Sequence, residues 1–202
     1  MDTSAQSHSY DIIFVIGPPG SGKGTLCSLT VDGLYESGDG NYYHLSVGDY
    51  LRELCETGRP GPRISIVRKH LLKDELLPAK TIIRLLDDKI DETINGDDTA
   101  IAILVDGFPR NIETALAFEE QIAKPAKVIV LECTRDTAQS RYLKRGREKS
   151  DNEERFKRRY DEYVENMKAI REHYGNNIQT ICVDGVLEGY IGKFISAVRK
   201  PK

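Results

Sequence analysis

The stretch "DIIFVIGPPGSGKGT", residues 11 to 25, joins an apolar run to a glycine-rich segment that contains a lysine. Gly17, Gly22 and Lys23 have the spacing of a phosphate-binding loop, G-x-x-x-x-G-K-[ST], whose backbone N–H groups surround phosphate oxygens. Gly24 replaces the usual hydroxyl residue, and Thr25 brings a hydroxyl one position later. Because a glycine-rich turn with a surface lysine is the alternative, the interpretation depends on the rest of the chain.

Three continuous apolar runs with flanking turn residues predict buried β-strands at residues 11–17, 100–107 and 126–133. Two shorter segments, residues 42–46 and 178–184, are further strand candidates, and segments with helical spacing lie between the strands. The helical segments cover residues 24–36, 49–56, 64–73, 78–94, 111–122, 136–145, 151–174 and 187–200. Pro78 stands at a favourable first helical position. Since strands alternate with helices, we expect an α/β, three-layer P-loop fold with a central five-stranded parallel sheet and ligands beyond the carboxyl ends of its strands.

The length, the net charge and the cysteine content of the chain exclude several classes of protein. The 202 residues suit one domain, and a net charge of -3 argues against a general affinity for nucleic acid. We expect no secretory signal and no membrane span, hence residence in the cytoplasm or the nucleus, as a monomer. We interpret the cysteines as reduced and mostly buried, with neither disulfide nor zinc, at Cys27, Cys55, Cys133 and Cys182.

In the segment "LVDGFPR", an acidic residue, Asp106, stands near the end of the apolar run at residues 100–107. Asp106 stands where P-loop proteins hold Mg²⁺, directly or through water, and Arg110 follows beyond a turn that contains Gly107 and Pro109. In the alternative interpretation Asp106 is a turn residue and Arg110 is a solvated charge.

The segment "HLSVGDYLREL" carries a capping signal and an arginine. Ser46 and Asp49 have the spacing of a capping box, which is a structural role. Arg52 lies one turn into the expected helix, where an anionic ligand or a surface pair with Glu56 would each explain it. This segment alone leaves the choice open.

Six arginines occur in "RYLKRGREKSDNEERFKRR", and four of them, Arg141, Arg145, Arg158 and Arg159, bear on the function. Arg141 and Arg145 share a helix face, where like charges are unfavourable unless an anion lies between them; favourable charge at a helix end is the alternative. Arg158 has glutamates four residues to either side and fits a solvated ion-pair ladder. Arg159 has only Glu162 nearby and is the better functional candidate of the two.

Phosphoryl transfer between nucleotides would explain all these segments, because it requires positioning, Mg²⁺ and several arginines. We interpret the histidines as surface or capping residues; they are His8, His44, His70 and His173. The segments "GPPGSGKGT", "HLSVGDYLR", "DGFPRN" and "RYLKRG" with "DNEERFKRR" follow the order and approximate spacing found in the nucleoside monophosphate kinase family, which contains adenylate kinase and UMP/CMP kinase. The chain resembles this family over nearly its whole length after residue 10.

The resemblance implies reversible transfer of the γ-phosphoryl group of Mg·ATP to a nucleoside monophosphate. ATP would be bound by Gly17, Pro18, Pro19, Gly20, Ser21, Gly22, Lys23, Gly24, Thr25, Arg141 and Arg145. The acceptor would contact Ser46, Val47, Gly48, Arg52, Leu77, Gly107, Phe108, Arg110, Asn111 and Thr114. The catalytic residues would be Lys23, Arg110, Arg145, Arg159 and Asp106, with Asp106 holding Mg²⁺ through water.

The resemblance also implies two mobile inserts in a single domain. The core would cover residues 10–45, 78–145 and 152–200, the acceptor-binding insert about 46–77 and a short lid about 146–152. The lid would contain Arg147, Lys149 and Asp151. Either Arg147 or Lys149 would take the place of the family's additional lid arginine, and a lysine there would supply a point charge instead of a bidentate fork.

The acceptor is predicted from a few residues. Phe108 in "DGFPRN" resembles UMP/CMP kinase, since adenylate kinases more often have tyrosine there, and UMP and CMP are therefore favoured over AMP. Val47 and Thr114 match neither group, and Asn111 is alternatively a helix N-cap. A catalytically weak nucleotide-binding scaffold is the rival from another class. A GTPase-like switch is disfavoured, since the chain has no N-K-x-D segment.

Overall fold

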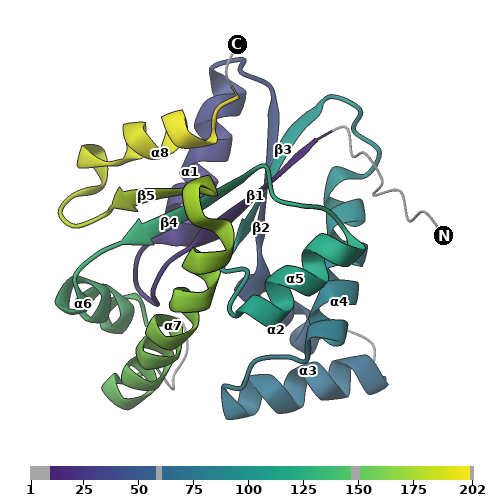
Figure 1. Ribbon diagram of the computed structural model, residues 1–202, viewed down its shortest axis with the longest axis vertical. Coiled ribbons are helices and arrows are strands. Elements are labelled where there is room, and N and C mark those ends of the chain that lie inside the picture. The colour runs from purple at the N-terminus through teal and green to yellow at the C-terminus, as the bar shows by residue number, and fades with distance from the viewer. Residues whose placement is uncertain (1–9, 58–60, 147–150, 201–202) are drawn as a thin grey trace.

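A central sheet of five parallel strands organises the chain (Figure 1). The computed structural model describes residues 10–57, 61–146 and 151–200. In chain order the strands are β1 (Asp11–Ile16), β2 (Asn41–Ser46), β3 (Ala100–Asp106), β4 (Lys127–Glu132) and β5 (Ile178–Cys182). Their order across the sheet is β2-β3-β1-β4-β5. The predicted five-stranded parallel sheet is confirmed, with strand bounds within two residues of the sequence prediction.

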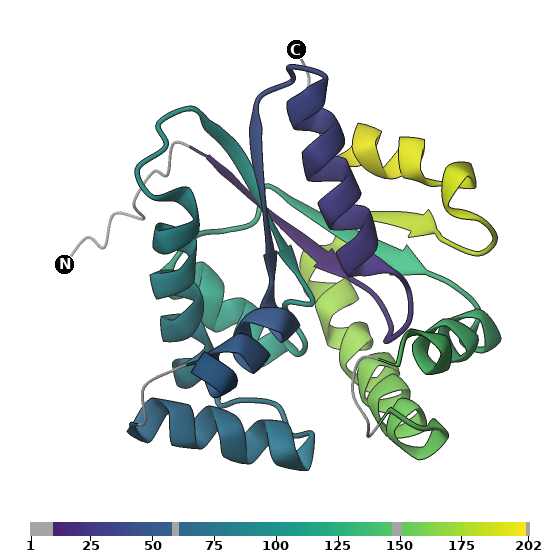
Figure 2. The same cartoon turned by 180° about the vertical axis from the view of Figure 1, so that it is seen from behind.

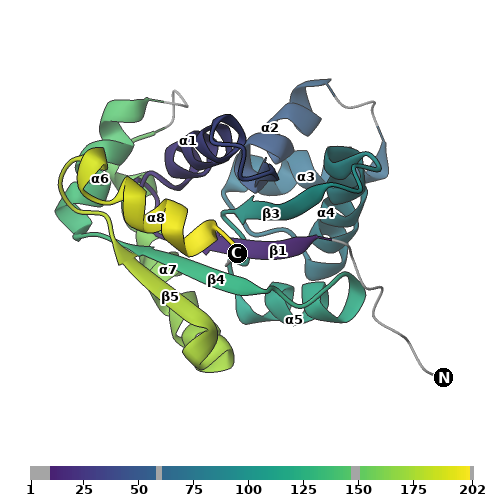
Figure 3. The same cartoon turned by 90° about the horizontal axis from the view of Figure 1, so that it is seen from above.

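Helices cover both faces of the sheet. They are α1 (Lys23–Glu36), α2 (Val47–Thr57), α3 (Pro62–Lys73), α4 (Ala79–Ile94), α5 (Ile112–Gln121), α6 (Arg135–Arg145), α7 (Glu153–Tyr174) and α8 (Ile191–Val198). Figure 3 shows α1 and α8 on one side of the sheet and α5 and α7 on the other. In Figure 2 the dark blue α1 lies in front of the sheet, with the yellow α8 beside it. The three-layer architecture is therefore confirmed.

Alternation along β1 explains the two cores. Ile12 and Phe14 belong to the core under α4, α5 and α7, whereas Ile13 and Val15 belong to the core under α1 and α8. All four side chains are buried, as expected for a strand that is covered on both faces. The larger core contains an aromatic cluster in which Phe14 contacts Phe108 and Phe118 edge to face, at 5.3 and 5.0 Å between ring centroids.

The register of the parallel strands determines where the polar residues meet. Asp106 at the end of β3 is level with Val15 of β1 and Ser46 of β2. The glycine-rich segment begins two residues after Val15. The carboxyl ends of β1, β2 and β3 therefore bring the polar segments of the sequence together at one edge of the sheet.

Three expectations about local structure need correction. Pro78 is the N-cap of α4, outside its first turn. The predicted helix 187–200 is interrupted, because Tyr190 takes a non-helical φ of -135° between the 3-10 turn η2 (Leu187–Gly189) and α8. Of the four cysteines only Cys27 is buried.

Within the described part of the chain, no helix combines the length and the apolar character that crossing a bilayer requires.

Candidate active site

A cleft of about 480 Å³ lies at the carboxyl ends of the strands. Its floor is the glycine-rich segment between β1 and α1, where backbone N–H groups at the start of a helix favour an anion. Gly20 has a φ of +86°, and a β-carbon there would lie 2.0 Å from the carbonyl oxygen of Ala138 in α6. Glycine at this position therefore allows the loop to pack directly against α6.

Lys23 is the first residue of α1, and its side chain bends back over the loop. Its ammonium group donates to the carbonyl oxygens of Gly17 (2.9 Å) and Pro18 (3.1 Å). Burial lowers the pKa of Lys23 to about 8, and the charges of Arg110, Arg159 and Arg145 act in the same direction against the opposing effect of Asp106. A cation held among other cations is stabilised when an anion binds between them.

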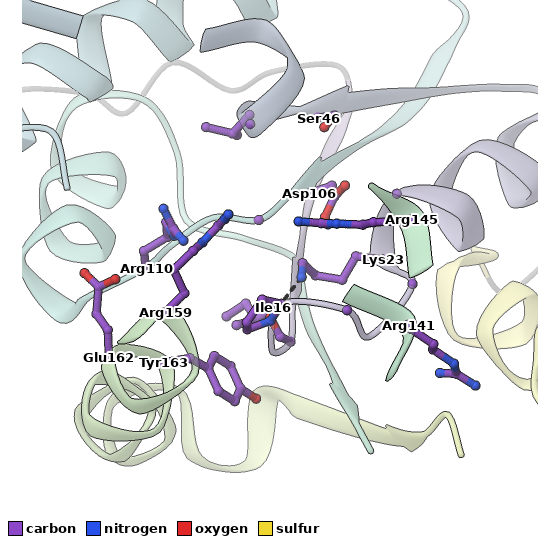
Figure 4. A pocket seen from close by; sticks show the side chains of 18 of the residues that line it. Ile16, Lys23, Ser46, Asp106, Arg110, Arg141, Arg145, Arg159, Glu162 and Tyr163 are labelled. Atoms are coloured by element: carbon purple, nitrogen blue, oxygen red, sulfur yellow. Dashed lines mark hydrogen bonds between the residues drawn. The ribbon is translucent and has the colours of Figure 1, made fainter. Parts of the chain in front are cut away.

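Three arginines face Lys23 in the cleft. In Figure 4, Arg110 and Arg159 extend towards it from one side, and Arg145 extends over it from the other. Arg110 is accessible from the cleft although protein surrounds its stem, and burial followed by the charge of Arg159 lowers its pKa to about 10. Within residues 10–57, 61–146 and 151–200, neither Arg110 nor Arg159 forms an ion pair. These like charges at close range indicate a site for a polyanion.

The buried ring of Tyr142 orients two of these arginines. The guanidinium group of Arg145 lies 4.4 Å from the ring centroid and that of Arg159 lies 6.0 Å from it. Cation–π contacts of this kind hold a guanidinium group without neutralising it. Arg159 therefore keeps its positive charge for a ligand, whereas Arg145 also has a carboxylate nearby, with its Nε 3.6 Å from Asp151 Oδ2.

Asp106 lines the cleft and contacts a histidine for which the sequence predicts a surface or capping role. His44 Nε2 lies 3.4 Å from Asp106 Oδ2, and His44 Nδ1 lies 3.2 Å from Ser28 Oγ. That interpretation of His44 is wrong, because its side chain is only 15% exposed and contacts a residue that lines the cleft. The signal was its position on β2, two residues before Ser46, which is level with Asp106.

At the start of α2, Ser46, Asp49 and Arg52 form a chain of contacts. Asp49 N donates to Ser46 Oγ (3.4 Å), as the capping box predicts, and Ser46 Oγ donates in turn to Asp49 Oδ2 (2.6 Å). Arg52 forms an ion pair with Asp49 (2.5 Å), three residues earlier in the chain. The sequence offers Glu56, four residues later, as the partner of a surface pair. This pair turns the guanidinium group back towards the start of α2, next to the cleft.

Arg141 has partners on the protein. It donates to the carbonyl oxygens of Val183 (2.8 Å) and Gly185 (2.7 Å), and it lies 6.0 Å from the ring centroid of Tyr190. In Figure 4 its side chain extends away from Lys23. Arg141 therefore borders the outer part of the cleft, together with Tyr190 and Leu187.

One face of α7 lines the cleft, and sequence reasoning identified only Arg159 on it. The face consists of Arg155, Arg159, Glu162, Tyr163, Met167 and Ile170. These residues lie three or four positions apart along the helix, so they share one face. Once Arg159 is placed in the cleft, this spacing predicts the others. The expected ladder around Arg158 is not what the structure shows, because Arg158 contacts Asp74.

The structure brings most of the predicted residues together. Those that line the cleft are Gly17, Pro19, Gly20, Gly22, Lys23, Gly24, Thr25, Ser46, Val47, Gly48, Arg52, Asp106, Gly107, Arg110, Arg141, Arg145 and Arg159. Those outside its lining are Pro18, Ser21, Leu77, Phe108, Asn111, Thr114 and Asp151. Phe108 is buried in the aromatic cluster, and Asn111 caps α5 by accepting from Thr114 N (2.9 Å). Arg147 and Lys149 lie outside the described residues.

Comparison with known proteins agrees with this geometry. The sequence model of the adenylate kinase family matches residues 15–179. Adenylate kinase isoenzyme 1 of Oryctolagus cuniculus is 35% identical over 167 residues, which cover 81% of this chain and 80% of that protein. Uridylate kinase of Saccharomyces cerevisiae is 31% identical over 188 residues, covering 90% and 87%. Uridylate kinase of Schizosaccharomyces pombe is 33% identical over 179 residues, covering 87% and 89%.

Proposed function

The chain belongs to the adenylate kinase family, and we propose that, as an ATP-dependent nucleoside monophosphate kinase, it uses UMP and CMP as its favoured acceptors. The meeting of Lys23 with Arg110, Arg145 and Arg159 in one cleft is the observation that supports phosphoryl transfer, and the acceptor preference rests on the sequence features given below. Phosphoryl transfer depends mainly on positioning and on neutralising the charge of the moving group. The cluster supplies both.

On the donor side, the glycine-rich loop binds the ATP phosphates through backbone N–H groups, and Lys23 contacts the transferred group. Asp106 fits the role of holding hydrated Mg²⁺, because its Oδ1 atom is buried and has no hydrogen-bond partner among the described residues. When bound with ATP, Mg²⁺ neutralises phosphate charge. His44 keeps the other carboxylate oxygen of Asp106 in position.

On the acceptor side, Arg52 and Arg110 bind the phosphate of the nucleoside monophosphate. Arg52 reaches the cleft from α2, and Arg110 reaches it from the segment after β3. A guanidinium group donates two parallel hydrogen bonds to one phosphate. These bonds orient the acceptor phosphate towards the transferred group and also neutralise part of its negative charge. Arg145 and Arg159 then close on the group in transit, and exclusion of water prevents hydrolysis.

The preference for UMP and CMP is supported by "DGFPRN" and by the two uridylate kinases among the relatives. AMP is the alternative acceptor, since relatives named adenylate kinase isoenzyme 1 are 35% and 34% identical, against 31% and 33% for the two uridylate kinases. Asn111 is occupied as the cap of α5, and the hydroxyl of Thr114 donates to the carbonyl of Asn111 (3.0 Å). Both side chains therefore have structural partners that a base would have to compete with.

Steady-state rates with UMP, CMP, dCMP, AMP and GMP, each offered separately with Mg·ATP, test the proposal. We expect kcat/KM to be highest for UMP and CMP. A higher value for AMP would replace the proposed acceptors and leave the reaction unchanged. ATP binding without acceptor-dependent ADP would favour the nucleotide-binding scaffold.

A further inference from the structure

Asp74 occupies an unusual backbone position at the end of α3. It is the C-cap residue, with φ 52° and ψ 35°, in the left-handed region that favours glycine. Apart from glycines, only Asn95 shares a positive φ with it in the described ranges. Glycine would be less strained here, so the aspartate side chain requires its own explanation.

The carboxylate of Asp74 binds two arginines of α7. Arg155 Nε donates to Asp74 Oδ1 (2.8 Å) and Oδ2 (2.9 Å), and the Nη2 atoms of Arg155 and Arg158 also donate to it. Although burial alone would raise the pKa of Asp74, the hydrogen bonds and charges of these arginines lower it below its ordinary value. Asp74 and Arg155 both line the cleft.

This contact joins the two sides of the cleft. The carboxyl end of α3 faces the start of α7 in Figures 1 and 2, and Asp74 and Arg155 are 81 residues apart in the sequence. Arg155 Nη1 also lies 3.4 Å from Asp151 Oδ1, and Arg145 Nε lies 3.6 Å from Asp151 Oδ2. A continuous series of charges therefore leads from α3 through Arg155 and Asp151 to Arg145.

An ordinary surface ion pair would not have this geometry. The side chains of Asp74 and Arg155 are 16% and 11% exposed, and Asp151 is 1% exposed. On the same helix, Lys157 and Asp161 form an exposed pair at 3.1 Å, of the kind that contributes little. A partly buried guanidinium group that shares several donors with one carboxylate is held far more firmly.

We propose that Asp74 is a positioning residue that ties α3 to α7 before substrates bind. The tie keeps the two sides of the cleft near each other and holds Arg155, and through Asp151 also Arg145, in place. Its kinetic consequence rests on the proposed function: an acceptor that enters a cleft already drawn together needs less binding energy to complete closure. The tie itself belongs to the free protein.

Asp74→Asn and Asp74→Gly test this inference, with Asp161→Asn as the matched control on α7. Asparagine and glycine both tolerate the left-handed backbone, so the folded state is kept. We expect the acceptor KM to rise by about fivefold or more, which is the usual lower range of coupling between sites. We expect kcat to change by less than about twofold, because Arg145 keeps its direct contact with Asp151 when Asp74 is replaced. Asp161→Asn is expected to leave both constants at their wild-type values.

Hydrogen exchange of the free protein provides a readout that is independent of catalysis. Without nucleotides, α3 and the first turn of α7 are expected to exchange faster in both Asp74 variants and at the wild-type rate in Asp161→Asn. In a cycle with Arg155→Gln, the double variant Asp74→Asn/Arg155→Gln is expected to match the single variants.

Unchanged exchange together with an unchanged acceptor KM in both Asp74 variants would overturn the inference, as would additive effects in the cycle. A lower melting temperature with a normal acceptor KM would show a merely structural role. If the wild-type protein has no acceptor-dependent turnover, the proposed function fails. In that case the exchange data still decide whether the tie exists.

Discussion

Lys23→Met tests the electrostatics of the glycine-rich loop, because it removes the cation and keeps an unbranched side chain. In the folded protein the pKa of Lys23 is lowered from 10.5 to about 8, first by burial. At about 1.4 kcal/mol per pH unit, this difference corresponds to about 3 kcal/mol that opposes folding below about pH 8. We therefore expect the variant to lose turnover while its stability, relative to wild type, depends on pH.

The sign of this dependence follows from proton binding. Between about pH 8 and 10.5 the folded protein releases the proton of Lys23 while the unfolded chain retains it, so the wild type gains stability as the pH rises. Between about pH 7 and about pH 9 the gain is about 1 kcal/mol. The free energy of unfolding of the variant minus that of wild type should fall by this amount over the same interval.

Urea denaturation of both proteins at the two pH values measures this difference. Lys127→Met is the matched control, because Lys127 also donates to two backbone carbonyls, those of Ala197 (2.7 Å) and Arg199 (3.3 Å), at the opposite end of the sheet. It reports the effect of losing such hydrogen bonds alone. A difference between Lys23→Met and wild type that stays constant, or grows with pH, would refute the reasoning.

Further substitutions test individual positions. Gly20→Ala should abolish ATP binding and lower the free energy of unfolding more than Gly22→Ala does. Both glycines have a φ of +86°, but only at Gly20 would a β-carbon meet the carbonyl of Ala138, so similar unfolding midpoints would contradict this. Asn111→Ala should cost about 1 kcal/mol in urea denaturation and leave the ratio of kcat/KM for UMP and AMP unchanged, as expected for a cap. Arg110→Lys should raise the acceptor KM by about tenfold or more, since a lysine lacks the bidentate fork; an unchanged KM would remove Arg110 from the acceptor site.

The fold was predictable because its signals are local. The runs that became β1, β3 and β4 are continuous and rich in β-branched residues, and each is followed by a turn, so their length, composition and flanking residues identified buried strands. The helix predicted at 187–200 failed because spacing cannot show that Tyr190 leaves the helical backbone.

The site was predictable where a motif fixes both residue type and backbone, as in the glycine-rich loop. It was not predictable where partners come from distant segments. His44 reaches Asp106 across 62 residues, and Asp74 reaches Arg155 across 81. Such pairings depend on strand register and on helix placement, which the sequence does not state directly. The face of α7 that lines the cleft was partly predictable. Its helical spacing can be read from the sequence, but the segments that it faces across the cleft are distant in the chain.

The most direct test of the central claim follows all phosphorus species by ³¹P NMR while the protein acts on Mg·ATP with UMP, CMP and AMP present together. The arrangement of Lys23, Arg110, Arg145 and Arg159 predicts that ADP from the donor and new nucleoside diphosphate appear in equal amounts, with no inorganic phosphate. Lys23→Met should show neither product. Release of inorganic phosphate, or intact ATP beside all three acceptors, would contradict phosphoryl transfer by this site.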